Sequence, residues 1–117
     1  MCNEFIINGS LHIVDEGEKF SFNGNIKVIK SLHNYGILKC INVEIGDFIF
    51  NYGDIECNNI KINNDLFNYN NIKCNSIIVR DSLENYTTGN IECNNIIFGI
   101  SFSNYNNIKC KYIKNSK

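Results

Sequence analysis

The sequence contains no proline and no tryptophan, and its 117 residues carry a formal net charge of only −1. A nearly neutral chain lacks the strong field that recruits nucleic acid or anionic lipid, so we expect neither as a partner. No apolar run approaches the ~18 residues that a membrane-spanning helix needs, and residues 1–7 lack the basic region of a secretory signal. These absences predict a cytoplasmic protein without direct membrane insertion. The length suits a single domain over residues 1–117.

What the chain does contain is strongly biased. Asparagine (23 residues) and isoleucine (21 residues) together make up more than a third of the sequence. This combination is typical of turns that join β-branched strands. Six cysteines in a small chain are also compatible with a disulfide-bonded secreted scaffold. The missing secretory signal and the spacing of the cysteines favour reduced thiols instead.

Five of the cysteines recur at nearly constant spacing, with separations of 17, 17, 19 and 17 residues: Cys40, Cys57, Cys74, Cys93 and Cys110. Alignment on them brings apolar residues into columns two residues before and three residues after each cysteine, and five and nine residues after the first four. A tyrosine column follows, comprising Tyr35, Tyr52, Tyr69, Tyr86 and Tyr105. Copies of the unit begin near residues 5, 20, 38, 55, 72, 91 and 108. The earliest copy, containing Phe5, Ile7, Leu11 and Ile13, fits a shortened turn.

A period near 17 matches one coil of a β-solenoid, and the apolar residues within a unit alternate as they do in strands. We predict an all-β fold: a single-stranded parallel β-helix of about six coils of ~17 residues, stacked about 4.8 Å apart. Each coil has two clear short strands and a third short segment at the leucine column. Right-handed winding is favoured, because spacings of 17 and 19 are not multiples of the six-residue period of left-handed hexapeptide helices. The two extra residues near Thr87–Thr88–Gly89 are expected to bulge at a corner.

The polar position before each cysteine alternates in charge from copy to copy: Lys39, Glu56, Lys73, Glu92 and Lys109. A second alternating column begins with Lys27, Glu44 and Lys61. Opposite charges on adjacent strands contribute roughly 0.2–1 kcal/mol per pair, whereas like charges destabilise. The alternation therefore indicates stacking of these positions and carries no sign of catalysis.

The thiol column has two functional interpretations: a row of metal ions bound along the thiols, or a redox relay between them. No histidine lies in register with it, structural zinc sites favour paired ligands two to four residues apart, and a buried thiol packs as a small hydrophobe. We therefore predict core cysteines, no metal site and no cofactor. His12 and His33 are the only histidines, and no nucleophile, base and orienting group recur together. Without a glycine-rich phosphate loop either, no catalytic residue is predicted and an enzyme is not expected.

Two groups of residues are candidates for contacts with partners. Outward apolar residues predict a lateral interface, comprising Phe48, Phe50, Phe67, Ile78 and Ile97. The end coils of a β-helix present unpaired backbone groups and an open core, which predicts an end-to-end interface made of Phe5, Ile7, Leu11, Ile13, Ile108, Cys110 and Ile113. The charges of Lys111, Lys114 and Lys117 are candidates to prevent strand pairing at the C-terminal end. The tyrosine column fits either a stacked corner or an exposed strip that binds sugar or peptide.

The segment from Gly53 to Ile62 (GDIECNNIKI) and its echo from Gly89 to Phe98 (GNIECNNIIF) resemble the repeats of the bactofilin family, polymer-forming cytoskeletal proteins of bacteria. The resemblance covers roughly residues 5–113. It implies a right-handed β-helix that assembles into filaments without nucleotide. The chain departs from the family pattern in its asparagine, tyrosine and cysteine content and in lacking the usual tails.

Two hypotheses follow. The first is a non-enzymatic structural protein that joins end to end into filaments or oligomers in a cytoskeletal or scaffold role. Its partners are copies of itself and, in addition, another scaffold or cell-envelope protein. The second is a monomeric or small-oligomer binding module for a protein or glycan, acting through the three phenylalanines or the tyrosine column. A polysaccharide-cleaving enzyme is the third alternative, and it lacks the groove of acidic and basic residues that it would need.

Overall fold

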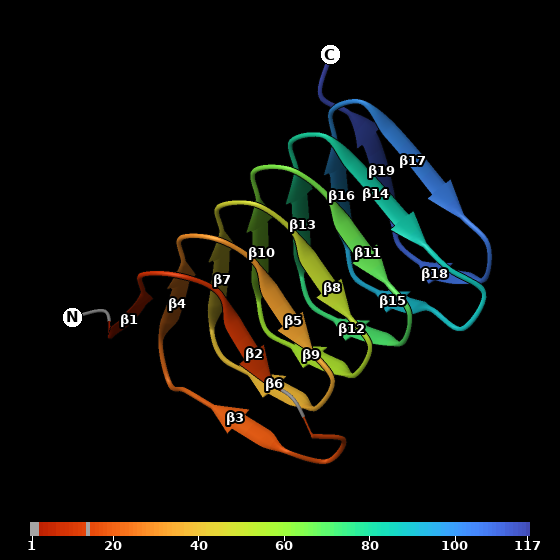
Figure 1. The fold of residues 1–117 in the computed structure, drawn as a ribbon. Coiled ribbons are helices and arrows are strands. Elements are labelled where there is room, and N and C mark those ends of the chain that lie inside the picture. Colours follow the sequence, from red (N-terminus) through yellow and green to blue (C-terminus); the bar gives the residue numbers. More distant parts are fainter. Residues whose placement is uncertain (1–2, 14) are drawn as a thin grey trace.

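The computed structural model describes residues 3–13 and 15–117 of the chain, which form nineteen β-strands and no helix. Each turn of the chain contributes one strand to each of three parallel sheets, so the strands stack into a β-solenoid (Figure 1). The predicted all-β solenoid is confirmed. The third segment, expected at the leucine column, is a strand in every turn.

Sheet A contains seven strands: β1 (Glu4–Ile7), β4 (Asn25–Val28), β7 (Asn42–Ile45), β10 (Asn59–Ile62), β13 (Ser76–Val79), β16 (Asn95–Phe98) and β19 (Tyr112–Asn115). Sheet B contains six: β2 (Leu11–Ile13), β5 (Leu32–Asn34), β8 (Ile49–Asn51), β11 (Leu66–Asn68), β14 (Ser82–Asn85) and β17 (Ser101–Asn104). Sheet C contains six: β3 (Lys19–Ser21), β6 (Ile37–Lys39), β9 (Asp54–Glu56), β12 (Asn71–Lys73), β15 (Asn90–Glu92) and β18 (Asn107–Lys109).

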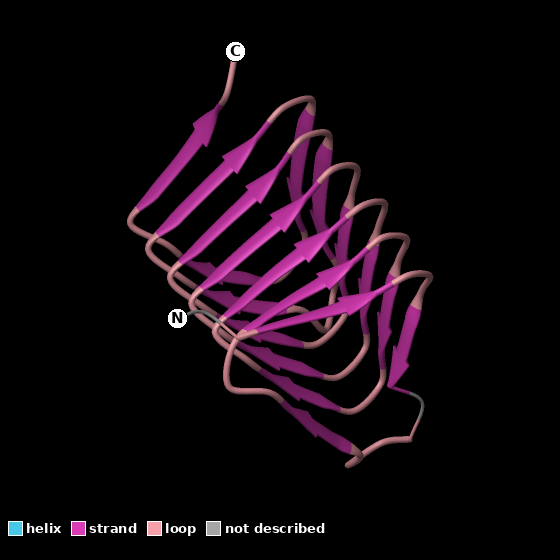
Figure 2. Cartoon of the chain, turned by 90° about the vertical axis from the view of Figure 1, so that its left-hand side faces the viewer, coloured by secondary structure: helices cyan, strands magenta, loops and turns pink. Residues whose placement is uncertain are grey.

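The coil is right-handed. Sheet B lies at the front of Figure 1 and runs downward, sheet C returns along the base, and sheet A rises at the back while the chain advances from its N-terminus to its C-terminus. Figure 2, seen from the N-terminal side, shows the same winding as a clockwise path that recedes from the viewer. The chain thus completes six turns, and β19 begins a seventh.

The interior is filled by columns of aliphatic side chains that repeat from turn to turn in register. In sheet A, Ile60 of β10 lies between Val43 of β7 and Ile77 of β13. In sheet B, Leu66 lies between Ile49 and Leu83, and all three are fully buried. Fully burying one such side chain contributes about 1.5–3 kcal/mol, so these columns supply the main driving force for folding.

A buried column of asparagines runs beside the aliphatic columns at the end of sheet B, and the sequence analysis did not foresee it. Each side-chain amide donates from Nδ2 to the Oδ1 of the asparagine one turn later, over distances of 2.8–2.9 Å, in the order Asn34, Asn51, Asn68, Asn85 and Asn104. The first four of these side chains are fully buried. Each of these four amides also donates to backbone carbonyls at the corner; Asn51, for example, reaches Gly53 and Asn71 at 3.0 Å. Every buried side-chain nitrogen or oxygen among the described residues has a partner.

The tyrosines that follow these asparagines point outward and do not line the interior; Tyr35, Tyr52 and Tyr105 are among the exposed residues. Asparagine takes the interior position because its amide both donates and accepts, and so it repeats along the axis without leaving a polar atom unpaired. A tyrosine in this position would have to bury its hydroxyl against the backbone of the corner. The ring instead leaves the corner with its hydroxyl toward solvent.

The regular corners between sheets B and C are tight. A β-carbon on Gly53 would clash with the carbonyl oxygen of Gly36 in the turn below, so this corner requires glycine.

Longer corners explain the breaks in the period. The two extra residues, Thr87 and Thr88, form a turn at the corner between β14 and β15, as predicted. The expected shortened first turn is wrong: Leu11 pairs with Leu32, which is 21 residues later, so the first turn is longer than the others. Three of its four added residues lie between β2 and β3, where Gly17 adopts a positive φ of 84°, and the fourth lies between β3 and β4.

We predict that Asn68→Ala lowers the free energy of unfolding by about 2–4 kcal/mol, because it leaves a void and deprives two buried amides of their partner. The matched control is Asn59→Ala, since Asn59 lies in an exposed column where it contacts Asn42 at 3.0 Å and Ser76 at 2.6 Å. We expect the control to cost less than about 1 kcal/mol. Denaturant unfolding of both variants measures the difference, and equal losses would show that the buried column has no special role.

Candidate functional site

Both ends of the solenoid present open sheet edges. At the first end, the outer edges of β1, β2 and β3 have no paired strand within the part of the chain that the structure describes. At the second end the same holds for β17, β18 and β19. Such edges carry backbone N–H and C=O groups that another strand can pair with.

The residues predicted for the end-to-end interface lie at these ends, with different exposures. Phe5 is 40% exposed and packs on Phe20 and Phe22, with ring centroids 5.8 and 5.5 Å apart. At the other end Ile113 is 46% exposed. Four further members are partly buried and pack against the core: Ile7, Leu11, Ile108 and Cys110. Ile13 is fully buried, so it supports its end from within instead of forming part of the surface.

The residues predicted for a lateral interface point outward but lie on two faces. Phe48, Phe50 and Phe67 form a cluster on the outside of sheet B, with centroid distances of 5.0–6.2 Å. Ile78 and Ile97 are neighbours on the outside of sheet A, where they continue the column formed by the charged residues of β4, β7 and β10. A single partner surface therefore includes one group or the other.

The two histidines extend the phenylalanine column, which sequence reasoning missed. His12 stacks on His33 at 4.6 Å, and His33 stacks on Phe50 at 4.9 Å. The signal was present in the sequence, because His33, Phe50 and Phe67 are each 17 residues apart. Burial, with a smaller contribution from the nearby His12, lowers the pKa of His33 below its usual value. We call this group the aromatic surface of sheet B; its members are His12, His33, Phe48, Phe50 and Phe67.

The tyrosine column is an outer stack at the corner between sheets B and C. Successive rings from Tyr35 to Tyr86 are 4.4–4.7 Å apart and nearly parallel, and Tyr86 and Tyr105 are 6.3 Å apart across the two-residue insertion. Within the stack each ring face is covered by the next ring, so the inner tyrosines Tyr52, Tyr69 and Tyr86 offer solvent their ring edges and hydroxyls. Sugar rings usually pack on an open aromatic face. The corner interpretation therefore fits the geometry better than a sugar-binding strip.

The five thiols form a half-buried column at the corner between sheets C and A, and all five are free. The Sγ atoms of Cys93 and Cys110 are 3.5 Å apart. The Cys57 thiol donates a hydrogen bond to Cys40; this bond, together with burial, raises the pKa of Cys57, and the same bond lowers the pKa of Cys40. Burial with the Cys93 contact raises the pKa of Cys110 to about 11. Protonated thiols are poor nucleophiles and poor metal ligands. Within the described residues no three or more His, Cys, Asp or Glu side chains gather so as to hold a metal ion.

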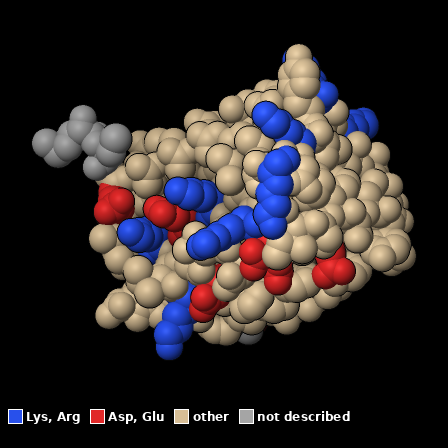
Figure 3. Space-filling view, turned by 90° about the horizontal axis from the view of Figure 1, so that it is seen from above, with Lys and Arg blue, Asp and Glu red and all other residues tan. Residues whose placement is uncertain are grey.

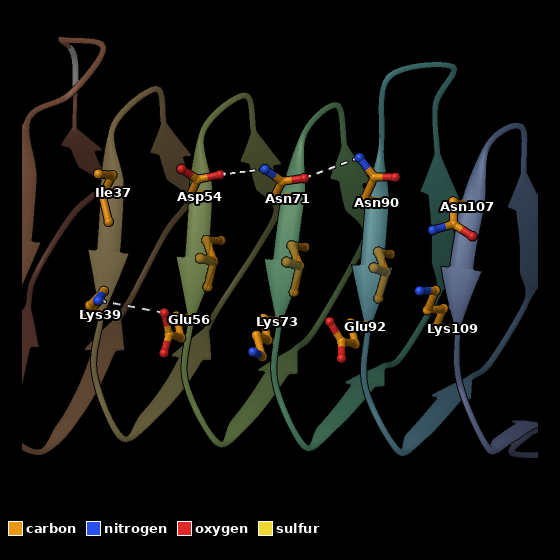
Figure 4. A pocket seen from close by; sticks show the side chains of 13 residues that line it. Ile37, Lys39, Asp54, Glu56, Asn71, Lys73, Asn90, Glu92, Asn107 and Lys109 are labelled. Atoms are coloured by element: carbon orange, nitrogen blue, oxygen red, sulfur yellow. Dashed lines mark hydrogen bonds and ion pairs between the residues drawn. The ribbon is translucent and has the colours of Figure 1, made fainter.

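The outer face of sheet C carries the predicted alternating charges. Lys39 Nζ lies 3.7 Å from Glu56 Oε2, and both side chains are about half exposed. A parallel column of hydrogen-bonded polar residues includes Asp54, Asn71 and Asn90, and the two columns border a shallow hollow of about 500 Å³ (Figure 4). Figure 3 shows acidic and basic side chains interspersed on another side of the molecule. Exposed pairs of this kind contribute little stability and mainly avoid like-charge contacts.

We predict that lowering the pH from 7.5 to 5.5 reduces the melting temperature by a few degrees. The pKa of His33 is lower in the folded protein than in the unfolded chain, so the unfolded state binds more protons in this range and stability falls as pH falls through it. His33→Phe keeps the stack with Phe50 and should remove much of this pH dependence. Thermal melts at both pH values test this, and an unchanged pH dependence in His33→Phe would contradict it.

In the described residues there is no helix with the length and apolarity to cross a membrane. No family model matches the chain, and no curated protein or solved structure is significantly similar to it. The open ends and the outer columns are therefore the features of the molecule that bear on its function.

Proposed function

We propose that the protein is a non-enzymatic structural protein that assembles end to end with copies of itself, in a cytoskeletal or scaffold role like that of the bactofilins it resembles. The observation that carries the proposal is that, within residues 3–13 and 15–117, all three sheets are open at both ends. Phe5 at one end and Ile113 at the other leave apolar surface exposed beside these edges.

Stacking one copy on another satisfies both features at once. A parallel strand added to an open edge forms the same backbone hydrogen bonds that join the turns within the molecule. The interior columns then continue across the junction, so Ile108 and its neighbours exchange water for apolar side chains. Another scaffold or cell-envelope protein with a matching edge is an additional partner for the same ends.

We predict that the purified chain forms filaments or ring-like oligomers in electron micrographs and sediments as large species at high concentration. Phe5→Glu and Ile108→Glu each place a buried charge in the junction and should reduce assembly by tenfold or more, since an unpaired buried charge costs several kcal/mol. The matched control is Ile41→Glu, because Ile41 is 39% exposed, close to the 40% of Phe5, and lies away from both ends. A strictly monomeric wild-type protein would refute the proposal.

A second candidate function is a binding module for a protein partner, and the aromatic surface of sheet B favours it. A continuous group of rings at an outer face is more than the scattered apolar residues of an ordinary surface. Aromatic side chains also contribute much of the energy at protein interfaces.

Replacing Phe48, Phe50 and Phe67 with serine should leave the far-UV spectrum unchanged and abolish capture of a partner that the wild-type chain retains. The control for this variant is Ile78→Ser with Ile97→Ser, which removes the apolar pair from the other face. Affinity capture followed by mass spectrometry compares the three proteins. If the triple variant retains the same partners as the wild type, the aromatic surface is not a binding site.

A further inference from the structure

The three sheets do not end at the same level. Counting along the chain, six turns each contribute one strand to sheets A, B and C, and β19 then adds a seventh strand to sheet A alone. At the other end, β1 begins the first turn in sheet A, before β2 and β3. Among the described residues, sheet A therefore has one strand more than sheets B and C, which have one strand for each of the six complete turns.

This count restricts how two copies join in the same direction. The next positions available in sheets B and C are those directly beyond β17 and β18. A second copy that places its β2 and β3 there continues both sheets without a gap. Its β1 then falls on the position that β19 occupies beside β16. The two strands cannot share it, so a fully paired junction requires one of them to leave.

The register shows which strand suits the position better. A β1 from the second copy places Phe5 beside Ile96 and Ile7 beside Phe98, extending two interior columns with apolar residues. On the outside it sets Ile6 beside Ile97.

Retaining β19 in the shared position gives poorer contacts with the second copy. Asn115 then meets Val28 in the interior, and Lys114 meets Lys27 on the outside. Like charges on adjacent strands destabilise, and a polar amide facing an aliphatic column loses its hydrogen bonds to water.

The strand β19 is also weakly held. All four of its residues are exposed, and in the part of the chain that the structure describes it pairs with β16 alone. At its two ends it is held to the rest of the fold by backbone bonds from Tyr112 N–H to the carbonyl of Asn94 at 3.0 Å and from Ser116 N–H to the carbonyl of Phe98 at 2.8 Å.

We propose that β19 is a placeholder strand, which covers the edge of sheet A in the free molecule and is displaced by β1 of the next copy during assembly. The inference rests on the proposed end-to-end function and adds the polarity and the partner strand of the junction. In the exchange, β1 of the second copy replaces β19 as the partner of β16. Two new strand pairs also form across the junction: β17 with the second copy's β2, and β18 with its β3.

The test is a full-length variant in which β19 is loosened. Tyr112→Pro with Ser116→Pro removes the two backbone donors, and Tyr112→Ala with Ser116→Ala is the matched control that keeps them. If β19 must leave, the critical concentration for assembly of the proline variant is at least roughly fivefold lower than that of the wild type. The alanine variant has the critical concentration of the wild type. Sedimentation across a concentration series measures this.

Hydrogen exchange on wild-type assemblies gives an independent measurement. Amides of residues 112–116 should lose protection on assembly, while those of residues 4–7 should gain it. Assembly of the proline variant that is weaker than or equal to wild type, or greater protection of residues 112–116 in assemblies, would overturn the placeholder role and leave end-to-end assembly standing. If neither protein assembles, the proposed function fails as well.

Discussion

Parallel stacking in register is the constraint on which the structure depends. Each side chain has a counterpart from the turns below and above at about 4.8 Å, so every column must be compatible with itself. Aliphatic residues satisfy this by packing, as in the column through Leu66. Charged residues satisfy it by alternating, as Lys39 and Glu56 do. Aromatic rings satisfy it by stacking face to face, as Tyr52 and Tyr69 do at 4.4 Å.

Asparagine is the most general solution to the same constraint, which explains its abundance. Its amide accepts from one neighbour and donates to the next, so identical residues bond indefinitely along the axis. The chain uses it both in the buried column through Asn51 and in exposed columns such as the one that joins Asn25, Asn42 and Asn59. An ionised carboxylate has no donor, and a hydroxyl is too short to reach both a neighbour and the backbone at a corner.

The sequence predicted the strands, the columns and the corner insertion because period and alternation are direct consequences of stacking. It did not predict Asn34 and its successors in the core, because most asparagines lie at exposed or partly exposed positions and only three-dimensional closure shows which ones face inward. The length of the first turn is predicted wrongly, because Phe5 fits two different columns as long as the length of the corner between β2 and β3 is unknown. The positions of Phe48, Phe50 and Phe67 were foreseen, but the separation of the apolar residues onto two faces required the winding of the coil.

The buried asparagine column also gives the molecule an electrical direction. All its amides point the same way, from Asn34 toward Asn104, so their dipoles add along the solenoid axis with the positive end at β17. Two molecules stacked in one direction align these dipoles favourably, whereas two molecules that meet through the same end oppose them. Although Ile13 occupies the first position and interrupts direct amide contact across a junction, the added dipoles favour a polar filament with two distinguishable ends.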